Sequence, residues 1–262
     1  MSTADALLRD GDLAGARAAL VEIVRAQPSD EKARMFLFQL LTITGEWRKA
    51  RSQLQSLAQL SAEAQMLAAA YGQLIEAEMI RQSVFAGDVR IDVLANADGW
   101  ASGLAEALHL FARGQADAAN VARGAAFDTA PDCNGTFNDQ PFDWIADADS
   151  RFGPSFELII AGRYGLMPFD AVEKIKCDGP RDLRDLVWLP IQLAMKSGQS
   201  IAAFLPTRYP GSESSSDPQV QLARATTWSS ASWGDQGSGQ RLWTLSSDED
   251  VGLLSLKLLA IN

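Results

Sequence analysis

Histidine and cysteine are scarce in this sequence, which limits the chemistry it can support. Among 262 residues there is one histidine, His109, and two cysteines, Cys133 and Cys177. A histidine-based triad or metal site would have to rely on His109, which lies in an apolar helical stretch with no nucleophile nearby. A packed helix histidine is the simpler interpretation. The two cysteines form no Cys-x-x-Cys pair, so we expect reduced thiols.

Long apolar runs and basic tracts are also missing. No stretch approaches the roughly 18 apolar residues of a membrane span, and the first residues lack the pattern of a secretory signal. The net charge is −10, with no basic cluster that could follow a phosphate backbone. We therefore expect a cytoplasmic protein with neither membrane nor nucleic-acid partners. Apolar content of 47% and charged content of 21% are typical of a globular chain of one or two domains.

The first half contains an internal repeat. In each copy, a glycine that can end one helix is followed by a small residue and then by apolar residues spaced to form one buried face of the next helix. The pattern recurs after roughly 34 residues, the period of tetratricopeptide helix pairs. The two copies are Gly11-Asp12-Leu13 with Ala16, Leu20 and Ile23, and Gly45-Glu46-Trp47 with Ala50, Leu54 and Leu57. Helices are predicted over Lys32–Ile43, Ala62–Phe85 and Trp100–Arg113, with a polar connection at Asp88–Gly99.

The second half has the composition of strands and turns. Short apolar segments alternate with glycine, proline and serine, which predicts a small twisted sheet or a partly closed barrel with minor helices. The glycine-rich run Gly234–Gly239 fits neither a dinucleotide fingerprint nor a P-loop and is predicted to be a flexible loop. The predicted fold is a two-part α+β chain. Residues 1–128 form a tetratricopeptide-like helical array, and residues 129–262 form a smaller, mainly-β domain. The strand candidates are Phe142–Ala146, Phe156–Gly162, Val187–Ala194, Ser200–Leu205, Ala223–Ser229, Arg241–Ser246 and Leu254–Ile261.

Carboxylates and an arginine cluster where the two halves meet. Asp147 and Asp149, two residues apart on a predicted strand end, could share one face and point into a cleft beside Arg151. That arrangement would suit a metal-dependent or acid/base hydrolase. The spacing of a calcium loop is absent, however, and the same residues could cap a turn or form ion pairs. Structural pairing is the favoured interpretation, and the hydrolase stays an alternative.

A second charged segment, Pro180–Pro190, alternates arginine and aspartate ahead of an apolar strand. Asp182, Arg184 and Asp185 suit a salt-bridged turn that seats the strand beginning near Trp188. Further on, Gly211-Ser212-Glu213 lacks the flanking pattern of a nucleophile elbow, and no histidine follows it. Serine hydrolysis is therefore disfavoured.

Several of these segments together resemble one family. In this order along nearly the whole chain, they are similar to the ImpE family, also called TagJ or SciE-type, of accessory proteins from bacterial type VI secretion systems. The segments are Ala126-Phe127 with Ala130-Pro131, Phe142–Pro154, Pro180–Trp188 with Pro190, Arg208-Tyr209, Gly211–Glu213, Ala223–Trp228 and Gly239–Arg241.

The resemblance implies a non-catalytic cytoplasmic adaptor without metal or cofactor. It would bind the small subunit of the contractile sheath, through an exposed helix of that subunit, and modulate sheath assembly or its recycling by the disassembly ATPase. A passive dimerising scaffold is a second alternative, so a homodimer stays open. The family-motif residues are interpreted as framework, with partner binding as the other possibility. They are Trp144, Asp147, Asp149, Arg151, Asp182, Arg184, Asp185, Trp188, Tyr209, Glu213, Arg224, Trp228 and Arg241.

Overall fold

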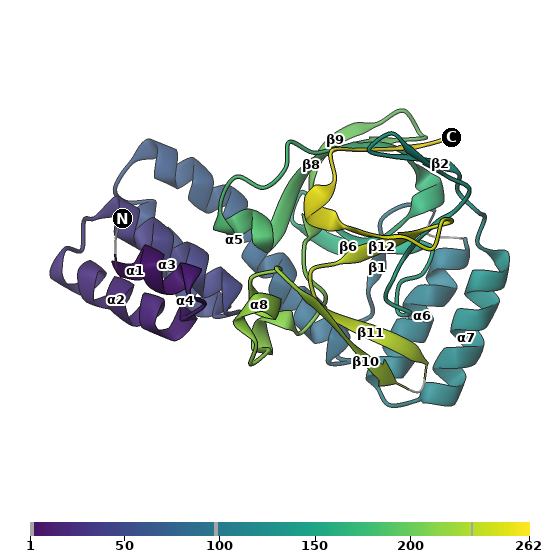
Figure 1. The fold of residues 1–262 in the computed structure, drawn as a ribbon, viewed down its shortest axis with the longest axis horizontal. Coiled ribbons are helices and arrows are strands. Elements are labelled where there is room, and N and C mark those ends of the chain that lie inside the picture. Colours follow the sequence, from purple (N-terminus) through teal and green to yellow (C-terminus); the bar gives the residue numbers. More distant parts are fainter. Residues whose placement is uncertain (1–2, 97–98, 232) are drawn as a thin grey trace.

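A helical N-terminal part precedes a mostly β part in the computed structural model, which describes residues 3–96, 99–231 and 233–262 (Figure 1). None of the helices in these residues is long and apolar enough to cross a membrane. The helices are α1 (Thr3–Arg9), α2 (Leu13–Ala26), α3 (Glu31–Ile43), α4 (Trp47–Leu57), α5 (Ala62–Phe85), α6 (Trp100–Ala112), α7 (Ala116–Thr129) and α8 (Pro218–Gln221).

The predicted turns between the first helices are confirmed. Gly11 and Gly45 have φ angles of 82° and 68°, a left-handed conformation that glycine adopts without a steric penalty, and each lies between two helices. Asp30 caps α3 by accepting a hydrogen bond from the backbone N–H of Ala33 at 3.0 Å. The tetratricopeptide-like arrangement of these helices stays a prediction.

Helix α5 joins the two parts of the molecule. It spans Ala62–Phe85, as the sequence predicts, and Ser61 caps its start through the backbone N–H of Ala64. Figure 1 shows α5 running from the N-terminal helices towards the strands. Its apolar residues do not form one stripe, so the helix buries side chains against both parts of the molecule.

The β part is built around one large sheet. Nine strands lie in the order β1-β6-β5-β9-β8-β7-β14-β2-β3, and a three-stranded sheet, β13-β12-β4, packs near it. The strands are β1 (Asp92–Val93), β2 (Gly135–Phe137), β3 (Gln140–Phe142), β4 (Ile145–Asp147), β5 (Ser155–Ile160), β6 (Arg163–Pro168), β7 (Val172–Lys176), β8 (Trp188–Met195), β9 (Ser200–Pro206), β10 (Thr226–Ala231), β11 (Gly234–Gly239), β12 (Leu242–Leu245), β13 (Asp250–Gly252) and β14 (Leu258–Ile261).

The large sheet does not close into a barrel in the described residues, and the partly closed barrel stays a prediction. Its outer strands are β1 and β3, which do not pair with each other. Every named pairing in this sheet is antiparallel except β1 with β6. Strand β1 lies within the segment predicted to be only a polar connection, and residues 97–98 of that segment lie outside the described residues.

The glycine-rich run is a strand and not a flexible loop. Gly234–Gly239 forms β11, which pairs antiparallel with β10 along its full length. A side chain at Gly237 could not be accommodated, because an added Cβ would lie 2.3 Å from the Tyr209 ring. Glycine is required here for the close approach of a neighbour, a role that composition alone does not distinguish from loop flexibility.

Two apolar clusters form the core. The first begins in α1 and continues through α5 into the β part, where it includes Tyr164, Trp188 and Trp233. The second lies within the β part, where Phe156 and Phe169 pack against Trp243 with ring centroids 5.5 and 5.2 Å away. Because the first cluster crosses residue 128, the two parts share a core, and the predicted domain boundary after residue 128 stays a prediction.

Candidate functional site

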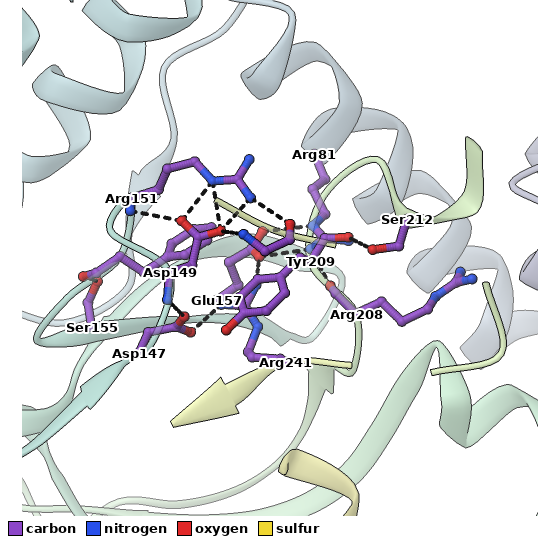
Figure 2. A network of polar contacts seen from close by, with 12 residues as sticks. Arg81, Asp147, Asp149, Arg151, Ser155, Glu157, Arg208, Tyr209, Ser212 and Arg241 are labelled. Atoms are coloured by element: carbon purple, nitrogen blue, oxygen red, sulfur yellow. Dashed lines mark hydrogen bonds and ion pairs between the residues drawn. The ribbon is translucent and has the colours of Figure 1, made fainter. Parts of the chain in front are cut away.

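A buried network of charged side chains lies where α5 meets the β part (Figure 2). Its centre is Glu157 on β5, whose side chain is fully buried. Arg81 of α5 approaches it as a fork, with Nε 2.7 Å from Oε1 and Nη2 2.8 Å from Oε2. Arg241 pairs with the same carboxylate, and the Tyr164 hydroxyl donates a hydrogen bond to it. Burial would raise the pKa of Glu157, but the two guanidinium groups and these hydrogen bonds hold it at about 2.

Arg241 connects this centre to the first aspartate of the family motif. Its guanidinium pairs with both Asp147 and Glu157, and all three side chains are completely excluded from solvent. The rings of Phe152 and Tyr209 lie over the guanidinium, with centroids 4.5 and 4.8 Å from its central carbon. Burial raises the pKa of Asp147 to about 7 despite the attraction of Arg241.

Asp149 and Arg151 form a local fork that holds strand β11. Nε of Arg151 lies 2.9 Å from Oδ1 of Asp149, and Nη2 lies 2.6 Å from Oδ2. The same two side chains reach Gly237, whose N–H donates to Oδ2 of Asp149 at 2.7 Å and whose C=O accepts from Nη2 of Arg151 at 3.3 Å. The pair therefore replaces a neighbouring strand along this edge of β11.

Asp182 and Arg184 repeat this geometry in the second charged segment. The N–H of Arg184 donates to Oδ1 of Asp182 at 2.8 Å, and Nε lies 2.9 Å from the same oxygen. Asp185 completes the cap of the short 3-10 helix Leu183–Leu186. The guanidinium of Arg184 lies over the ring of Tyr71, 4.6 Å from its centroid, which fixes the turn against the helices. The backbone N–H of Arg181 donates to Oδ2 of Asp185 at 2.6 Å, and the strand that follows is largely buried. Together with the Asp182–Arg184 pair, these contacts match the predicted salt-bridged turn.

The remaining motif residues lie at different depths. Trp188 is fully buried, and its indole N–H donates to Oε1 of Glu78 at 3.0 Å. Tyr209 is also buried, and its hydroxyl bridges the backbone of Leu242. Trp144 and Glu213 are half-buried, whereas Arg224 and Trp228 are exposed. The structure thus brings the buried motif residues together and leaves Arg224 and Trp228 at the surface.

Several members of the network are not among the residues predicted for the site, although Arg208 lies in one of the family segments. Arg208 is buried and donates to the carbonyl of Ile43 at 2.8 Å, and burial lowers its pKa to about 10. Glu157, Arg81 and Glu78 were also missed. Their signal was a charged residue inside an otherwise apolar strand or helix: Glu157 stands between Phe156 and Leu158, and α5 is apolar on more than one side. The pattern marks these residues as buried charges, but it does not identify their partners, which lie far away in the sequence.

The arrangement has little room for catalysis. Each motif aspartate already accepts hydrogen bonds from an arginine or from backbone N–H groups, and Asp147 and Asp149 are fully or almost fully buried. No group of three or more histidine, cysteine, aspartate or glutamate residues among those described could hold a metal ion. His109 is half-buried on α6, and both cysteines are free. The network joins α5, β4, β5 and β11, which is a structural arrangement.

Two adjoining hollows lie on the surface beside this network. The larger, of about 620 Å³, lies between the start of α4 and the end of α5 and includes Trp47, Met79 and Gln82. The other, of about 300 Å³, shares Gln82 and Ala86 with it and extends to Pro210 and Glu213. We call their combined lining the α4–α5 groove. Of the exposed large apolar side chains in the described residues, Met79 lines this groove and is 37% exposed.

Comparison with known proteins places this chain among relatives of one family. The family model described as "ImpE protein" matches residues 139–260. A Pseudomonas aeruginosa protein named "Type VI secretion system accessory component TagJ" is 41% identical over 248 residues, which cover 94% of this chain and 86% of that protein. A crystal structure of a Vibrio parahaemolyticus protein has a TM-score of 0.89 at 21% identity and covers 100% of this chain and 98% of that one. The last match concerns the fold alone.

Proposed function

The chain belongs to the ImpE family, and on that premise we propose that it is a non-catalytic accessory protein of a type VI secretion system. The observation that carries the proposal is the 41% identity, over 94% of the chain, to a protein named as an accessory component of such a system. The proposed partner is the small subunit of the contractile sheath. Binding would modulate assembly of the sheath or its recycling by the disassembly ATPase.

The α4–α5 groove is the proposed binding surface. It combines an exposed methionine, Met79, with polar groups of Gln82 and Glu213 along its edges. A groove with apolar anchor points and a polar rim suits one face of an amphipathic helix. Methionine adapts its shape to a partner more easily than branched side chains do. An exposed helix of the sheath subunit is accordingly the proposed occupant.

The buried network gives this surface its rigidity. Arg81 and Glu78 line the second hollow from α5, while their side chains are fixed from below by Glu157 and Trp188. Pro210 and Glu213 come from the segment that follows Arg208 and Tyr209. The motif residues therefore act through the fold, by holding the two walls of the groove at a fixed separation.

The hydrolase alternative finds no supporting geometry. Asp147 and Asp149 point towards Arg241 and Arg151, and the described contacts leave neither carboxylate facing solvent. A general acid or base must reach the reacting group of a substrate at hydrogen-bond distance. We therefore propose a binding protein and no catalytic step.

Mixing the purified chain with its cognate small sheath subunit tests the proposal. Size-exclusion chromatography with light scattering should show a complex that contains both proteins and is heavier than either protein run alone. Met79→Glu places a charge in the groove and should weaken the complex, whereas Met66→Glu makes the same change at the far end of α5 and serves as the control. Two folded proteins that fail to associate at tens of micromolar would refute the proposed partner.

A further inference from the structure

The β10–β11 ribbon is fixed along one edge only. Its inner edge, on β11, is bonded to the body of the protein at alternate residues, Asp235, Gly237 and Gly239. The C=O of Asp235 accepts from Ser150 N–H at 3.0 Å, and that of Gly239 accepts from Tyr209 N–H at 2.9 Å. Gly237 is held by the fork described above. Figure 1 shows the ribbon in the lower part of the molecule, away from the large sheet.

The outer edge, on β10, is open. The N–H of Gln240 donates to the C=O of Ala225 at 3.1 Å, towards β10. Gly237, which lies opposite Trp228, directs its N–H and C=O away from β10, so Trp228 and Gly237 are not a hydrogen-bonded pair of the ribbon. Because such pairs alternate in antiparallel strands, the N–H and C=O of Thr226, Trp228 and Ser230 point away from β11. In the described part of the chain no other strand lies beside β10.

The other outer strands are protected in ways that β10 is not. Strand β1 has two residues and contains Asp92, and β3 has three and contains Pro141. The outer strands of the three-stranded sheet, β4 and β13, have three residues each and contain Asp147 and Asp250. Short length, proline and charge are the usual means of preventing edge pairing. Strand β10 has six residues, Thr-Thr-Trp-Ser-Ser-Ala, without charge or proline, and the residues from Thr227 to Ala231 are exposed.

We propose that the open edge of β10 pairs antiparallel with β10 of a second copy of this chain. The chain carries a net charge of −10, so two copies repel unless they meet where charge is absent. The β10 edge meets that condition. Pairing would also extend the two-stranded ribbon to four strands and supply hydrogen-bond partners to the outward groups of β10. The inference goes beyond sheath binding and does not depend on it.

The register of the pairing follows from the outward-facing residues. A two-fold axis at Trp228 places this residue opposite its own copy and Thr226 opposite Ser230 of the other chain, so every outward N–H meets an outward C=O. The two indole rings then lie on one face of the four-stranded sheet as a cross-strand aromatic pair. This accounts for a tryptophan that is 41% exposed in the single chain.

Sedimentation velocity of the full chain tests the proposal. A strand pair buries less surface than a standard interface, so we expect dimers to form over about 1 to 200 µM. Ser230→Pro removes an outward N–H and should keep the protein monomeric throughout that range. Ser230→Ala loses only the side-chain bond to Asp235 and should dimerise within about twofold of the natural chain.

A second pair of variants keeps the test valid if the proline variant fails to fold. Trp228→Lys places two like charges opposite each other on the axis and should abolish the dimer, whereas Trp228→Phe keeps an aromatic pair and should retain it. Far-ultraviolet circular dichroism checks that each variant is folded. A natural chain that remains monomeric at about 200 µM would overturn the proposal, as would dimers that persist in folded Ser230→Pro or Trp228→Lys protein.

Discussion

Arg241 and Glu157 form an ion pair in which both side chains are completely removed from solvent. Arg241 comes from the strand-rich C-terminal segment, and Glu157 lies on β5 next to Arg81 of α5. One guanidinium therefore connects segments that are far apart in the sequence. Because a buried charge without its partner is costly, the Glu157 carboxylate, which Arg241 shares with Arg81, makes the packing of α5 depend on the folding of the β part.

Replacing Arg241 should strongly destabilise the protein. Arg241→Met keeps much of the volume but leaves the buried carboxylates of Asp147 and Glu157 without their shared partner, which should lower the free energy of unfolding by about 3–5 kcal/mol. Arg163→Ala is the control, because its pair with Asp92 is exposed on both sides and should contribute about 0–1 kcal/mol. Urea denaturation measures both values, and a loss below about 1 kcal/mol for Arg241→Met would contradict this account.

The stability of the protein should depend on the proton of Asp147. The pKa of this carboxyl is about 7 in the folded protein and near its ordinary value, about 4, in the unfolded chain. The folded state therefore holds a proton that the unfolded state releases, so this group lowers stability as pH rises from about 4 to 7, by up to about 1.4 kcal/mol per pH unit.

Asp147→Asn removes this dependence while keeping the shape of the neutral acid. Urea denaturation at intervals between pH 5 and 7 should give a flatter slope for the variant than for the natural chain. Glu157 acts in the opposite direction, because its pKa is lowered to about 2 in the folded protein. Its contribution to stability is complete at pH values above its ordinary pKa and is lost as the pH falls towards 2. Parallel slopes for the two proteins would show that Asp147 does not titrate in this range.

Two glycines should respond in opposite ways to alanine. At Gly237 an added Cβ would lie 2.3 Å from the Tyr209 ring, so Gly237→Ala should destabilise the protein by about 1–3 kcal/mol. Gly72 lies within α5 and an added Cβ would meet nothing within 4 Å, so Gly72→Ala should stabilise by about 0.5–1 kcal/mol. Thermal unfolding compares the two, and equal effects would contradict the assigned packing.

The fork of Asp149 and Arg151 should control the local stability of β11. Asp149→Ala removes the acceptor of the Gly237 N–H, so amide exchange at Gly237 should accelerate by roughly 5- to 150-fold, the equivalent of about 1–3 kcal/mol. Asp182→Ala breaks the equivalent fork in the other turn and should leave exchange at Gly237 unchanged. Hydrogen exchange followed by mass spectrometry distinguishes a local effect from general destabilisation.

The sequence predicts elements whose pattern is local and misses those that depend on distant contacts. Helix α5 and strands β8 and β9 have clear apolar patterns, and their predicted limits agree with the structure to within about two residues. Strand β11 was predicted to be a loop because glycine has low strand propensity. Its extended form is imposed by Asp149, Arg151 and Tyr209, which lie far away in the sequence.

The candidate site shows the same division. The two Asp-x-Arg turns could be recognised because both partners lie within three residues. Glu157 and Arg81 could not be paired from the sequence, because 76 residues separate them. Nothing in a single sequence specifies which of several arginines a buried carboxylate will meet. Whether the motif residues act as framework or as interface remains a prediction, and the groove variants address it.

Titration calorimetry with the cognate small sheath subunit tests the central claim most directly. The natural chain and Trp228→Lys should bind it with similar affinity, since β10 lies outside the α4–α5 groove, and Met79→Glu should bind at least about tenfold more weakly. Met66→Glu should match the natural chain. No binding by the natural chain at tens of micromolar would contradict the proposed function, whereas binding that Trp228→Lys alone abolishes would place the partner on β10 and refute the groove.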